Sequence, residues 1–568
     1  MTEPVTSMDR ISARIGFFVG VTGVLLLLSA AKLAGIQIRH HDEYAARADE
    51  QQTIQVRVEA QRGEILDRNG FLLAGNLTSA CFSVYWPNVP PEEVAGVELF
   101  AEGLGEYLTA SLPLCPTGCN QVLASTVPWE YAAAAMDSMP RYVDCSFVTS
   151  RVYPMDSLAA PVVGTHSENV SQGLEYQMED ILEGTDGLSY YQASAWSGYS
   201  AVDNEADNIP PVNGRDLLLT IDSRYQEIAQ RELQAAVEYS GSSWGAAVLV
   251  DPATGDILAM ASYPVFNEDG TLARNHCVQS STEPGSVFKA ITLAAALEGG
   301  YATMADSFDC RSSFVEIYGH RINDSHPVNS MLDLTGVIAH SSNVGTVALA
   351  QRIPDEAFYS VCQSFGFGQE TRIEFPSEQR GLLRDPSQWS GLSRANLAIG
   401  QEVSATPLQL AMAYSAIANG GLLLRPRLVC ATLEDGLFRE LADSPSKRVI
   451  SQETASAVRG ALTSVVEWGT GGSAAVPGVT VAGKTGTAER LNEDGYLSAF
   501  AGMVPAEEPR LVAVVVFDQP DREYRWGSAL AAPVFGRIVS AVISTSPEIA
   551  LGEPFSGGSL VAQGGDPR

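Results

Sequence analysis

The chain has 568 residues and a mass of 60.4 kDa, which exceeds one compact domain and suits two or three. Its 35 Lys and Arg residues are outnumbered by 67 Asp and Glu residues, so the formal net charge is −32 at pH 7. This charge excludes proteins that bind nucleic acid by neutralising phosphates, and a hydrophobic content of 45% excludes bulk disorder. Only four of the basic residues are lysines: Lys32, Lys289, Lys447 and Lys484.

An apolar segment near the amino end predicts a membrane anchor. Residues 15–36 carry no charge apart from one lysine, and this mostly apolar run is long enough to cross a bilayer of about 30 Å. Arg10 and Arg14 precede the segment, so the positive-inside rule places residues 1–14 in the cytoplasm and the rest of the chain outside. The small residues at 29–31 leave a cleaved signal peptide as the alternative, which a mature amino terminus directly after them would reveal.

All eight cysteines follow this segment, and an external location permits disulfide bonds. Cys115 and Cys119 form the most plausible local pair, although eight cysteines allow 105 pairings. Four potential metal ligands lie close together in a polar segment: Cys310, His320, Asp324 and His326. They are an alternative metal site, but we interpret them as random clustering in a polar loop. A C-x-x-C zinc pattern is absent, and we expect neither a metal nor a cofactor.

The chain changes character near residue 210. Residues 37–210 contain short apolar runs broken by proline and glycine, and they become small and polar near their end, which predicts a linker. A strand is then predicted over 217–221. Asp222 or Ser223 caps a helix that is expected to run to about Tyr239.

The remaining elements predict a second domain. Strands over 246–250 and 257–261 flank a short turn, and helical patterns then dominate to about residue 470, with helices beginning after Thr406 and Ser451. Two strands, then helices, then three strands predict one antiparallel sheet with helices inserted between its two parts. The last twenty residues, rich in Gly, Pro and Ser, predict a disordered tail. The three closing strands are expected over 479–488, 498–504 and 511–517.

Ser286 and Lys289 form an S-x-x-K motif. Pro284 and Gly285 followed by an apolar helical run place Ser286 at the start of a helix, where Lys289 shares its face. A serine hydroxyl needs a neighbouring base to act as a nucleophile, and a lysine amine serves once burial or a second cation lowers its pKa. The helix amino terminus also stabilises developing negative charge. The pair predicts a nucleophile and its base, although the motif alone has little specificity.

A second lysine motif lies on a predicted strand near the end of the chain: Lys484, Thr485, Gly486 and Thr487. A lysine beside hydroxyls suits a carboxylate, and glycine lets a ligand approach the backbone closely. Between the two lysine motifs, Ser341 and Asn343 form an S-x-N motif that supplies a hydroxyl and an amide. The order S-x-x-K, S-x-N, K-T-G is strong evidence for one active site.

With these three motifs the sequence resembles the penicillin-binding proteins and serine β-lactamases, and more narrowly the class B penicillin-binding proteins of the cell-division type. Four further segments carry the resemblance: 62–70 (RGEILDRNG), 173–175 (GLE) with 184–187 (GTDG), 399–401 (IGQ) and 406–409 (TPLQ). The resemblance extends from the anchor to about residue 545 and is weakest over 75–150. The elongation and sporulation types remain alternatives.

The resemblance implies a peptidoglycan D,D-transpeptidase that works by double displacement. Ser286 would attack the carbonyl between the two terminal D-alanines of a stem peptide, with Lys289 as base, and an amine of a neighbouring stem would then take the acyl group. Ser341 would relay the proton to the leaving amine, and Asn343 would bind the substrate amide. β-Lactams would acylate the same serine.

The K-T-G segment has implied functions of its own. Lys484 would support Ser341 and the electrostatics of the site. Thr485, Gly486 and Thr487 would bind the terminal carboxylate of the substrate. The backbone N–H groups of Ser286 and Thr487 would form the oxyanion hole, in which each donor is worth about 3–4 kcal/mol in comparable enzymes.

The resemblance also implies the architecture. We expect an α/β (α+β) transpeptidase domain of the serine β-lactamase type, with a five-stranded antiparallel sheet, helices on both faces and a helical subdomain. One transmembrane helix and a non-catalytic, mixed α/β pedestal of the dimerisation type would precede it. The expected parts are a cytoplasmic tail (1–14), an anchor (15–36), the pedestal (37–210), the transpeptidase domain (211–548) and a disordered tail (549–568).

The implied partners are peptidoglycan stem peptides, β-lactams, the lipid bilayer, a membrane glycan polymerase and other division or elongation proteins. A separate polymerase is expected because the pedestal carries the class B signature in place of a glycosyltransferase domain. Gly16 and Gly20 form a G-x-x-x-G pattern in the anchor and are one candidate contact with another membrane helix.

Three other functions remain open. A D,D-carboxypeptidase or β-lactamase uses the same serine but transfers the acyl group to water, and neither needs an anchor with a pedestal. A β-lactam sensor needs several membrane spans or a cytoplasmic output domain. A non-catalytic scaffold of the division machinery predicts decayed motifs, whereas all three motifs are complete here. These features favour the transpeptidase.

Overall fold

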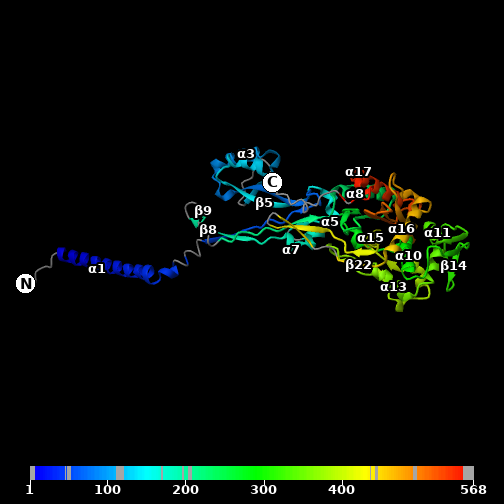
Figure 1. Ribbon diagram of the computed structural model, residues 1–568. Helices are drawn as coiled ribbons and strands as arrows, with labels where there is room; N and C mark the ends of the chain where they lie inside the picture. The colour runs from blue at the N-terminus through cyan, green and yellow to red at the C-terminus, as the bar shows by residue number, and fades with distance from the viewer. Residues whose placement is uncertain are drawn as a thin grey trace, which may run out of the picture. The chain divides into compact units, whose positions relative to one another are not determined.

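The computed structural model, shown in Figure 1, describes residues 7–44, 47, 53–109, 120–167, 170–194, 198–201, 208–434, 437–441, 445–489, 495–553 and 555. The chain divides into two units. The first comprises Met1–Gln61 with Gly184–Asn213, and the second comprises Arg62–Glu183 with Gly214–Arg568.

The first unit consists of an apolar helix and a small sheet. Helix α1 spans Ser7–Ala34 and leads into a π-helical turn, η1, over Gly35–Arg39. Within the described residues, Arg10–Arg39 is the one helical stretch that is long and apolar enough to cross a membrane, as expected from the sequence. The sheet is antiparallel with the order β1-β8-β9, formed by β1 (Thr53–Val58), β8 (Gly187–Ser194) and β9 (Gly198–Ala201).

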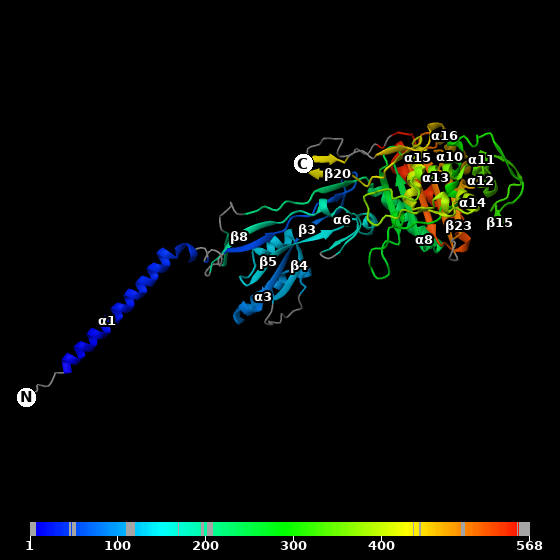
Figure 2. The same cartoon turned by 90° about the horizontal axis from the view of Figure 1, so that it is seen from below.

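The second unit begins with a seven-stranded mixed sheet. Its order is β21-β20-β10-β2-β3-β4, and β5 also pairs with β3. The strands are β2 (Ile65–Leu66), β3 (Leu72–Tyr85), β4 (Asn120–Pro128), β5 (Val143–Val152), β10 (Asp216–Leu219), β20 (Val429–Glu434) and β21 (Leu437–Glu440). Figure 2 shows α3 beside β3, β4 and β5. The helices of this part are α3 (Val94–Gly103), α4 (Trp129–Met136), α5 (Ala160–Val163), α6 (Gly173–Gln177) and α7 (Glu179–Leu182).

The strand expected over 217–221 is β10, and it belongs to this first sheet. Leu217 lies opposite Ile65 of β2 in a parallel pair, and Leu218 lies opposite Ala431 of β20 in an antiparallel pair. Strands from the beginning, the middle and the later part of the chain therefore share one sheet. The mixed α/β pedestal expected from the sequence is present, but its sheet continues into residues beyond 210.

A buried charge cluster holds the pedestal segments together. The carboxylate of Glu175 is fully buried and accepts hydrogen bonds from Arg62 Nε and Arg151 Nε, each at 2.7 Å. Tyr153 OH donates to the same carboxylate at 3.3 Å. The 62–70 segment and the Gly173-Leu174-Glu175 segment therefore meet, because a buried carboxylate requires charged partners.

The 62–70 segment also contacts the first helix of the later domain. Asp67 is fully buried and accepts hydrogen bonds from Phe71 N at 2.9 Å and from Asn69 N at 2.8 Å. Its second oxygen accepts from Ser223 Oγ at 2.7 Å, at the start of α8 (Ser223–Ser240). Asp222 caps α8 through Arg224 N, as the sequence predicted.

A five-stranded antiparallel sheet forms the centre of the second domain. Its order is β12-β11-β25-β24-β23, so the two strands before the helices and the three after them join at β11 and β25, as expected. Every residue of β11 and β25 is buried, because both faces of the sheet are covered. The strands are β11 (Trp244–Val250), β12 (Ile257–Tyr263), β23 (Ala482–Glu489), β24 (Tyr496–Val504) and β25 (Leu511–Asp518).

Helices cover both faces of this sheet. Alternate residues such as Ala247 and Val515 pack against α8 and α17 (Ala531–Thr545), which lie side by side in Figure 1. The opposite face, including Val248 and Val514, packs against α15, and α16 packs against β23. The remaining helices of the domain are α9 (His276–Gln279), α10 (Lys289–Glu298), α11 (Leu334–Ala339), α12 (Asn343–Ala350), α13 (Asp355–Ser364), α14 (Ser393–Ala398), α15 (Pro407–Ala418) and α16 (Gln452–Glu467).

The predicted helix caps are confirmed. Thr406 and Gln409 form a capping box at the start of α15, and Pro407 occupies its first turn. Ser451 caps α16 by accepting from Thr454 N. The helical region also contains short strand pairs that the sequence patterns did not predict: β13 (Ser307–Cys310) with β16 (Ser330–Asp333), β14 (Phe314–Ile317) with β15 (His320–Asn323), β17 (Leu382–Leu383) with β18 (Val403–Ser404), and β19 (Leu422–Leu424) with β22 (Ser446–Arg448).

Two expectations fall outside the described residues. The Cys115–Cys119 pair lies wholly outside them, and so does most of the expected tail over 549–568. The described cysteines carry free thiols: Cys81, Cys145, Cys277, Cys310, Cys362 and Cys430.

Candidate active site

Ser286 lies in a 3-10 turn, Gly285–Phe288, that leads directly into α10. Gly285 has a φ of +55°, and its N–H donates to the carbonyl of Gly400 at 3.1 Å. Tyr414 of α15 is buried and donates its hydroxyl to Val287 O at 2.9 Å. The turn that presents the predicted nucleophile is therefore held from two sides.

The backbone at Gly400, in the 399–401 segment, has a conformation and a close contact that require glycine. Its φ is +81°, and a Cβ at this position would lie 2.0 Å from Gly285 O. We expect Gly400→Ala to destabilise the protein by about 3 kcal/mol or more, because backbone strain of about 1–2 kcal/mol adds to this clash. Gly478→Ala is the matched control, since Gly478 has a φ of +83° with no atom within 4 Å. Equal losses of thermal stability in the two variants would show that the clash is relieved without cost.

Lys289 lies beneath the cleft and is fully buried. Its Nζ donates to Ser341 O and to Asn343 Oδ1, each at 2.6 Å, and lies 3.3 Å from Ser341 Oγ. Burial lowers the pKa of this amine to about 7, although the negative charge of Asp324 acts in the other direction and raises it. In the described part of the chain no hydrogen bond joins Lys289 to Ser286. The amine is thus engaged with the S-x-N motif, and a large part of it is neutral near pH 7.

The S-x-N motif lies between α11 and α12. Ser341 has a φ of +57°, which is rare for a residue other than glycine and places strain at this turn. Ser342 caps α12 by accepting from Gly345 N. Asn343 Nδ2 donates to Asn323 O at 2.7 Å, while its oxygen faces Lys289.

Asp324 is a supporting residue whose function the sequence did not reveal. One of its oxygens accepts from Asn343 N at 2.5 Å and Val344 N at 3.0 Å, and the other accepts from Ser342 Oγ at 2.9 Å. The carboxylate therefore fixes the S-x-N turn at the start of α12, where the helix dipole favours a negative charge. No short motif marks this aspartate, because its partners lie 18 to 20 residues further along the chain.

The four potential metal ligands noted in the sequence do not assemble into a metal centre. Within the described residues, no group of three or more His, Cys, Asp or Glu side chains could hold a metal ion. Asp324 binds the S-x-N turn, and Cys310 Sγ accepts from Ser342 Oγ at 3.5 Å.

Strand β23 at the edge of the central sheet carries the K-T-G motif. Lys484 is fully buried and donates to Thr485 O at 3.2 Å. Its pKa is held well below the ordinary lysine value by burial and by the charge of Lys289. The two hydroxyls of the motif are oriented by neighbours, since Thr485 Oγ1 lies 2.9 Å from Thr470 Oγ1 and Thr487 Oγ1 accepts from Gly527 N at 3.1 Å.

Gly486 is a buried residue of the motif strand β23 and is not among the residues that line the cleft. A Cβ on Gly486 would lie 2.7 Å from Val287 Cγ2 of the nucleophile turn. A Cβ on Gly527 would lie 2.5 Å from Gly486 O. Glycine therefore lets the nucleophile turn, the K-T-G strand and the loop after β25 approach one another.

A cleft of about 320 Å³ brings the motifs together. The predicted residues that line it are Ser286, Ser341, Asn343, Thr485 and Thr487. Two histidine–tryptophan pairs on its walls were not predicted from the sequence: His326 with Trp526 and His340 with Trp468, whose ring centroids are 5.4 and 5.5 Å apart. Among the described residues that line the cleft, none is acidic. A buried lysine pair beneath hydroxyls and N–H donors suits acyl transfer from a substrate with a carboxylate.

Comparison with known families agrees with this geometry. Residues 245–540 match the penicillin-binding protein transpeptidase domain, and residues 57–219 match the penicillin-binding protein dimerisation domain. The chain therefore belongs to the penicillin-binding protein transpeptidases. Within them it is a class B protein, because the dimerisation domain precedes the transpeptidase domain. The resemblance stated from the sequence is confirmed.

Individual relatives are similar over nearly their whole length. Penicillin-binding protein PbpB of Mycolicibacterium smegmatis is 33% identical, over 91% of this chain and 88% of its own. The probable peptidoglycan D,D-transpeptidase PenA of Neisseria meningitidis is 30% identical, over 95% of this chain and 94% of its own. The crystal structure of penicillin-binding protein 3 from Mycobacterium tuberculosis with aztreonam is 30% identical, with a TM-score of 0.67, over 89% of this chain and 99% of that chain.

Proposed function

We propose that this protein is a membrane-anchored peptidoglycan D,D-transpeptidase that cross-links stem peptides through an acyl-enzyme on Ser286. The observation that carries the proposal is one cleft in which Ser286, the S-x-N pair and the two threonines of the K-T-G strand meet above two buried lysines. Two relatives support the proposal. One is the probable peptidoglycan D,D-transpeptidase PenA of Neisseria meningitidis, and the other is penicillin-binding protein 3 of Mycobacterium tuberculosis, whose crystal structure contains aztreonam.

In the first half-reaction, Ser286 Oγ attacks the carbonyl carbon between the two terminal D-alanines. Neutral Lys289 takes the hydroxyl proton, and the backbone N–H groups of Ser286 and Thr487 hold the oxyanion. Ser341, which lies 3.3 Å from Lys289 Nζ, passes the proton to the departing amine. The amide bond breaks, free D-alanine leaves, and an ester to Ser286 remains. Thr485 and Thr487 bind the substrate's terminal carboxylate, with the K-T-G lysine Lys484 supporting Ser341.

In the second half-reaction, an amine of a neighbouring stem attacks the ester carbonyl. Its proton returns through the same lysine, an amide cross-link forms, and Ser286 regains its hydroxyl. Transfer to water in place of an amine would make the protein a D,D-carboxypeptidase or β-lactamase. Similarity to a probable peptidoglycan D,D-transpeptidase over 95% of this chain and 94% of that protein favours the transpeptidase.

The proposal extends to topology and partners. Arg10 begins the spanning helix, and an amino end in the cytoplasm places the catalytic domain outside, where peptidoglycan lies. The proposed parts are those indicated by the sequence: a cytoplasmic tail (1–14), an anchor (15–36), the pedestal (37–210), the transpeptidase domain (211–548) and a tail (549–568). Residues 57–219 match the dimerisation domain, and this supports a separate membrane glycan polymerase that supplies the glycan strands at the division septum.

Labelling with a fluorescent penicillin tests the proposal. The full chain should form one covalent adduct, and Ser286→Ala should abolish it, because the ester oxygen is then missing. Ser325→Ala is the matched control, since Ser325 also lines the cleft but has no assigned function. An adduct on Ser286→Ala, or none on the folded wild type, would refute the acyl-enzyme. A donor stem peptide with an amine acceptor then separates cross-linked from hydrolysed product.

A further inference from the structure

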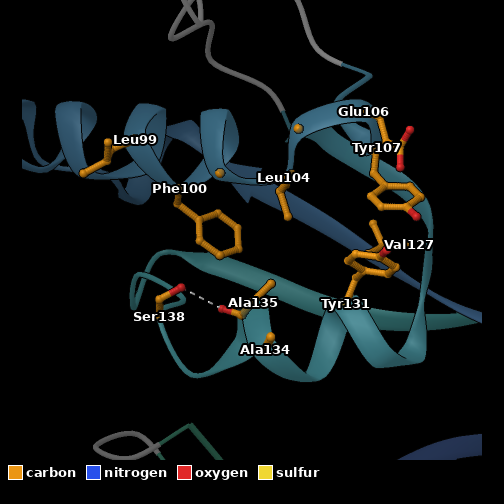
Figure 3. A pocket seen from close by; sticks show the side chains of 13 residues that line it. Leu99, Phe100, Leu104, Glu106, Tyr107, Val127, Tyr131, Ala134, Ala135 and Ser138 are labelled. Carbon is orange, nitrogen blue, oxygen red and sulfur yellow. Dashed lines mark hydrogen bonds between the residues drawn. The ribbon is translucent and has the colours of Figure 1, made fainter.

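An apolar groove crosses the part of the pedestal built from β3, β4, α3 and α4, and we call it the head groove. Figure 3 shows Phe100 and Leu104, from α3 and the residue after it, pointing toward Ala134 and Ala135 of α4. The groove has a volume of about 630 Å³. At one end Tyr107 and Tyr131 lie against each other, with ring centroids 5.3 Å apart. The two helices thus form the walls of an apolar channel.

Large apolar side chains that line the groove are exposed to solvent. Leu99 is 71% exposed and Tyr131 is 58% exposed. Phe100, which lines the groove, packs edge to face against the buried Phe82 with ring centroids 5.4 Å apart, so the core of this part lies directly beneath the groove. Contiguous apolar surface of this kind on a soluble domain marks a site of association. An apolar groove walled by two helices suits an amphipathic helix that places its apolar face in the groove.

The negative charge around the groove indicates which kind of helix would bind there. From Asn69 to Pro140 the sequence contains no Lys, Arg or His, while it contains seven acidic residues: Glu92, Glu93, Glu98, Glu102, Glu106, Glu130 and Asp137. Glu106 lines the groove, and Glu102 and Glu130 are exposed on its two helices. An apolar channel with an acidic rim selects a partner whose apolar face is flanked by Lys or Arg.

We propose that the head groove binds an amphipathic, basic helix of another protein, with apolar residues at i, i+3, i+4 and i+7 and lysines or arginines beside them. The site is separate from the catalytic cleft and does not depend on the acyl-transfer chemistry. A second copy of the chain does not fit, because it would bring the same acidic rim. An anionic lipid surface is repelled for the same reason.

The test uses the full chain in zwitterionic lipid nanodiscs. The probe is a fluorescein-labelled 14-residue Leu/Lys peptide with the apolar spacing given above, and its anisotropy is compared with a Leu/Glu peptide and a Ser/Lys peptide. Empty nanodiscs give the background from lipid. We expect the Leu/Lys peptide to bind above this background and the other two to bind at least tenfold more weakly, because both the apolar contact and the charge are needed.

Two substitutions locate the binding. Leu99→Ser should weaken Leu/Lys binding about tenfold, whereas Leu437→Ser on β21, where the leucine is 69% exposed, should leave it unchanged. Glu106→Lys with Glu130→Lys should reverse the preference toward the Leu/Glu peptide. Unchanged melting temperatures establish that each variant is folded. Equal binding of the three peptides, binding no greater than to empty nanodiscs, or full binding by Leu99→Ser would overturn the proposal.

Discussion

Lys289→Ala is expected to slow acylation by a β-lactam by roughly 10²- to 10⁴-fold, the range that a general base contributes. The amine lies 2.6 Å from both Ser341 O and Asn343 Oδ1, so its loss also loosens the turn that faces the nucleophile. Lys289→Arg should not restore the rate, because a guanidinium keeps its proton near neutral pH. The measurement is the second-order rate of labelling by a fluorescent penicillin.

The same amine sets the pH dependence. Burial lowers the pKa of Lys289 to about 7, so below this pH the amine is protonated and cannot accept the proton of Ser286. The labelling rate should therefore rise with pH and level off above about pH 7. Lys447→Ala is the matched control, because Lys447 is an exposed lysine on β22 and should leave both the rate and its pH profile unchanged. A flat profile in the wild type would assign the proton transfer to another group.

Glu175→Ala should lower the free energy of unfolding by about 3–5 kcal/mol, the usual cost of removing one member of a buried ion cluster. The substitution leaves two guanidinium groups, those of Arg62 and Arg151, facing each other in a buried site without their common carboxylate. Unfolding in guanidinium chloride measures the loss. Because the cluster lies in the pedestal, the acylation rate of the protein that remains folded should be unchanged.

An exposed pair supplies the control for the buried cluster. Asp309 and Arg311 form an ion pair whose side chains are 52% and 68% exposed, so Asp309→Ala should leave stability nearly unaltered. A loss for Glu175→Ala as small as that of the control would mean that water enters and solvates the two arginines.

The sequence predicted the central sheet well, because its strands are long apolar runs and its helices have strong caps. Thr406 with Gln409 and Ser451 act as predicted, since each cap depends on residues within three positions of it. The short strand pairs between residues 307 and 333 were missed. Their pairing depends on contacts between segments that are each only four residues long, which leaves little periodicity to read.

In the candidate site too, residues with a local sequence signal were predicted, and residues placed by contacts between distant segments were not. Ser286, Lys289 and the K-T-G strand were found because scarce lysines and short motifs mark them. Asp324 and the wall residue Trp526 were not found as parts of the site, because their positions depend on how distant loops fold over α12 and β23. No local pattern distinguishes such residues from ordinary loop residues.

The shared sheet of β2, β10 and β20 limits how the protein can be divided. A fragment that begins at residue 211 keeps β10 and β20 but lacks β2, so one side of β10 presents unpaired backbone N–H and C=O groups. It also loses Asp67, the partner of Ser223 at the start of α8. Such an open edge is a template for association with other chains. A swap of the pedestal between relatives therefore requires that the joining strands β2, β10 and β20 be exchanged together.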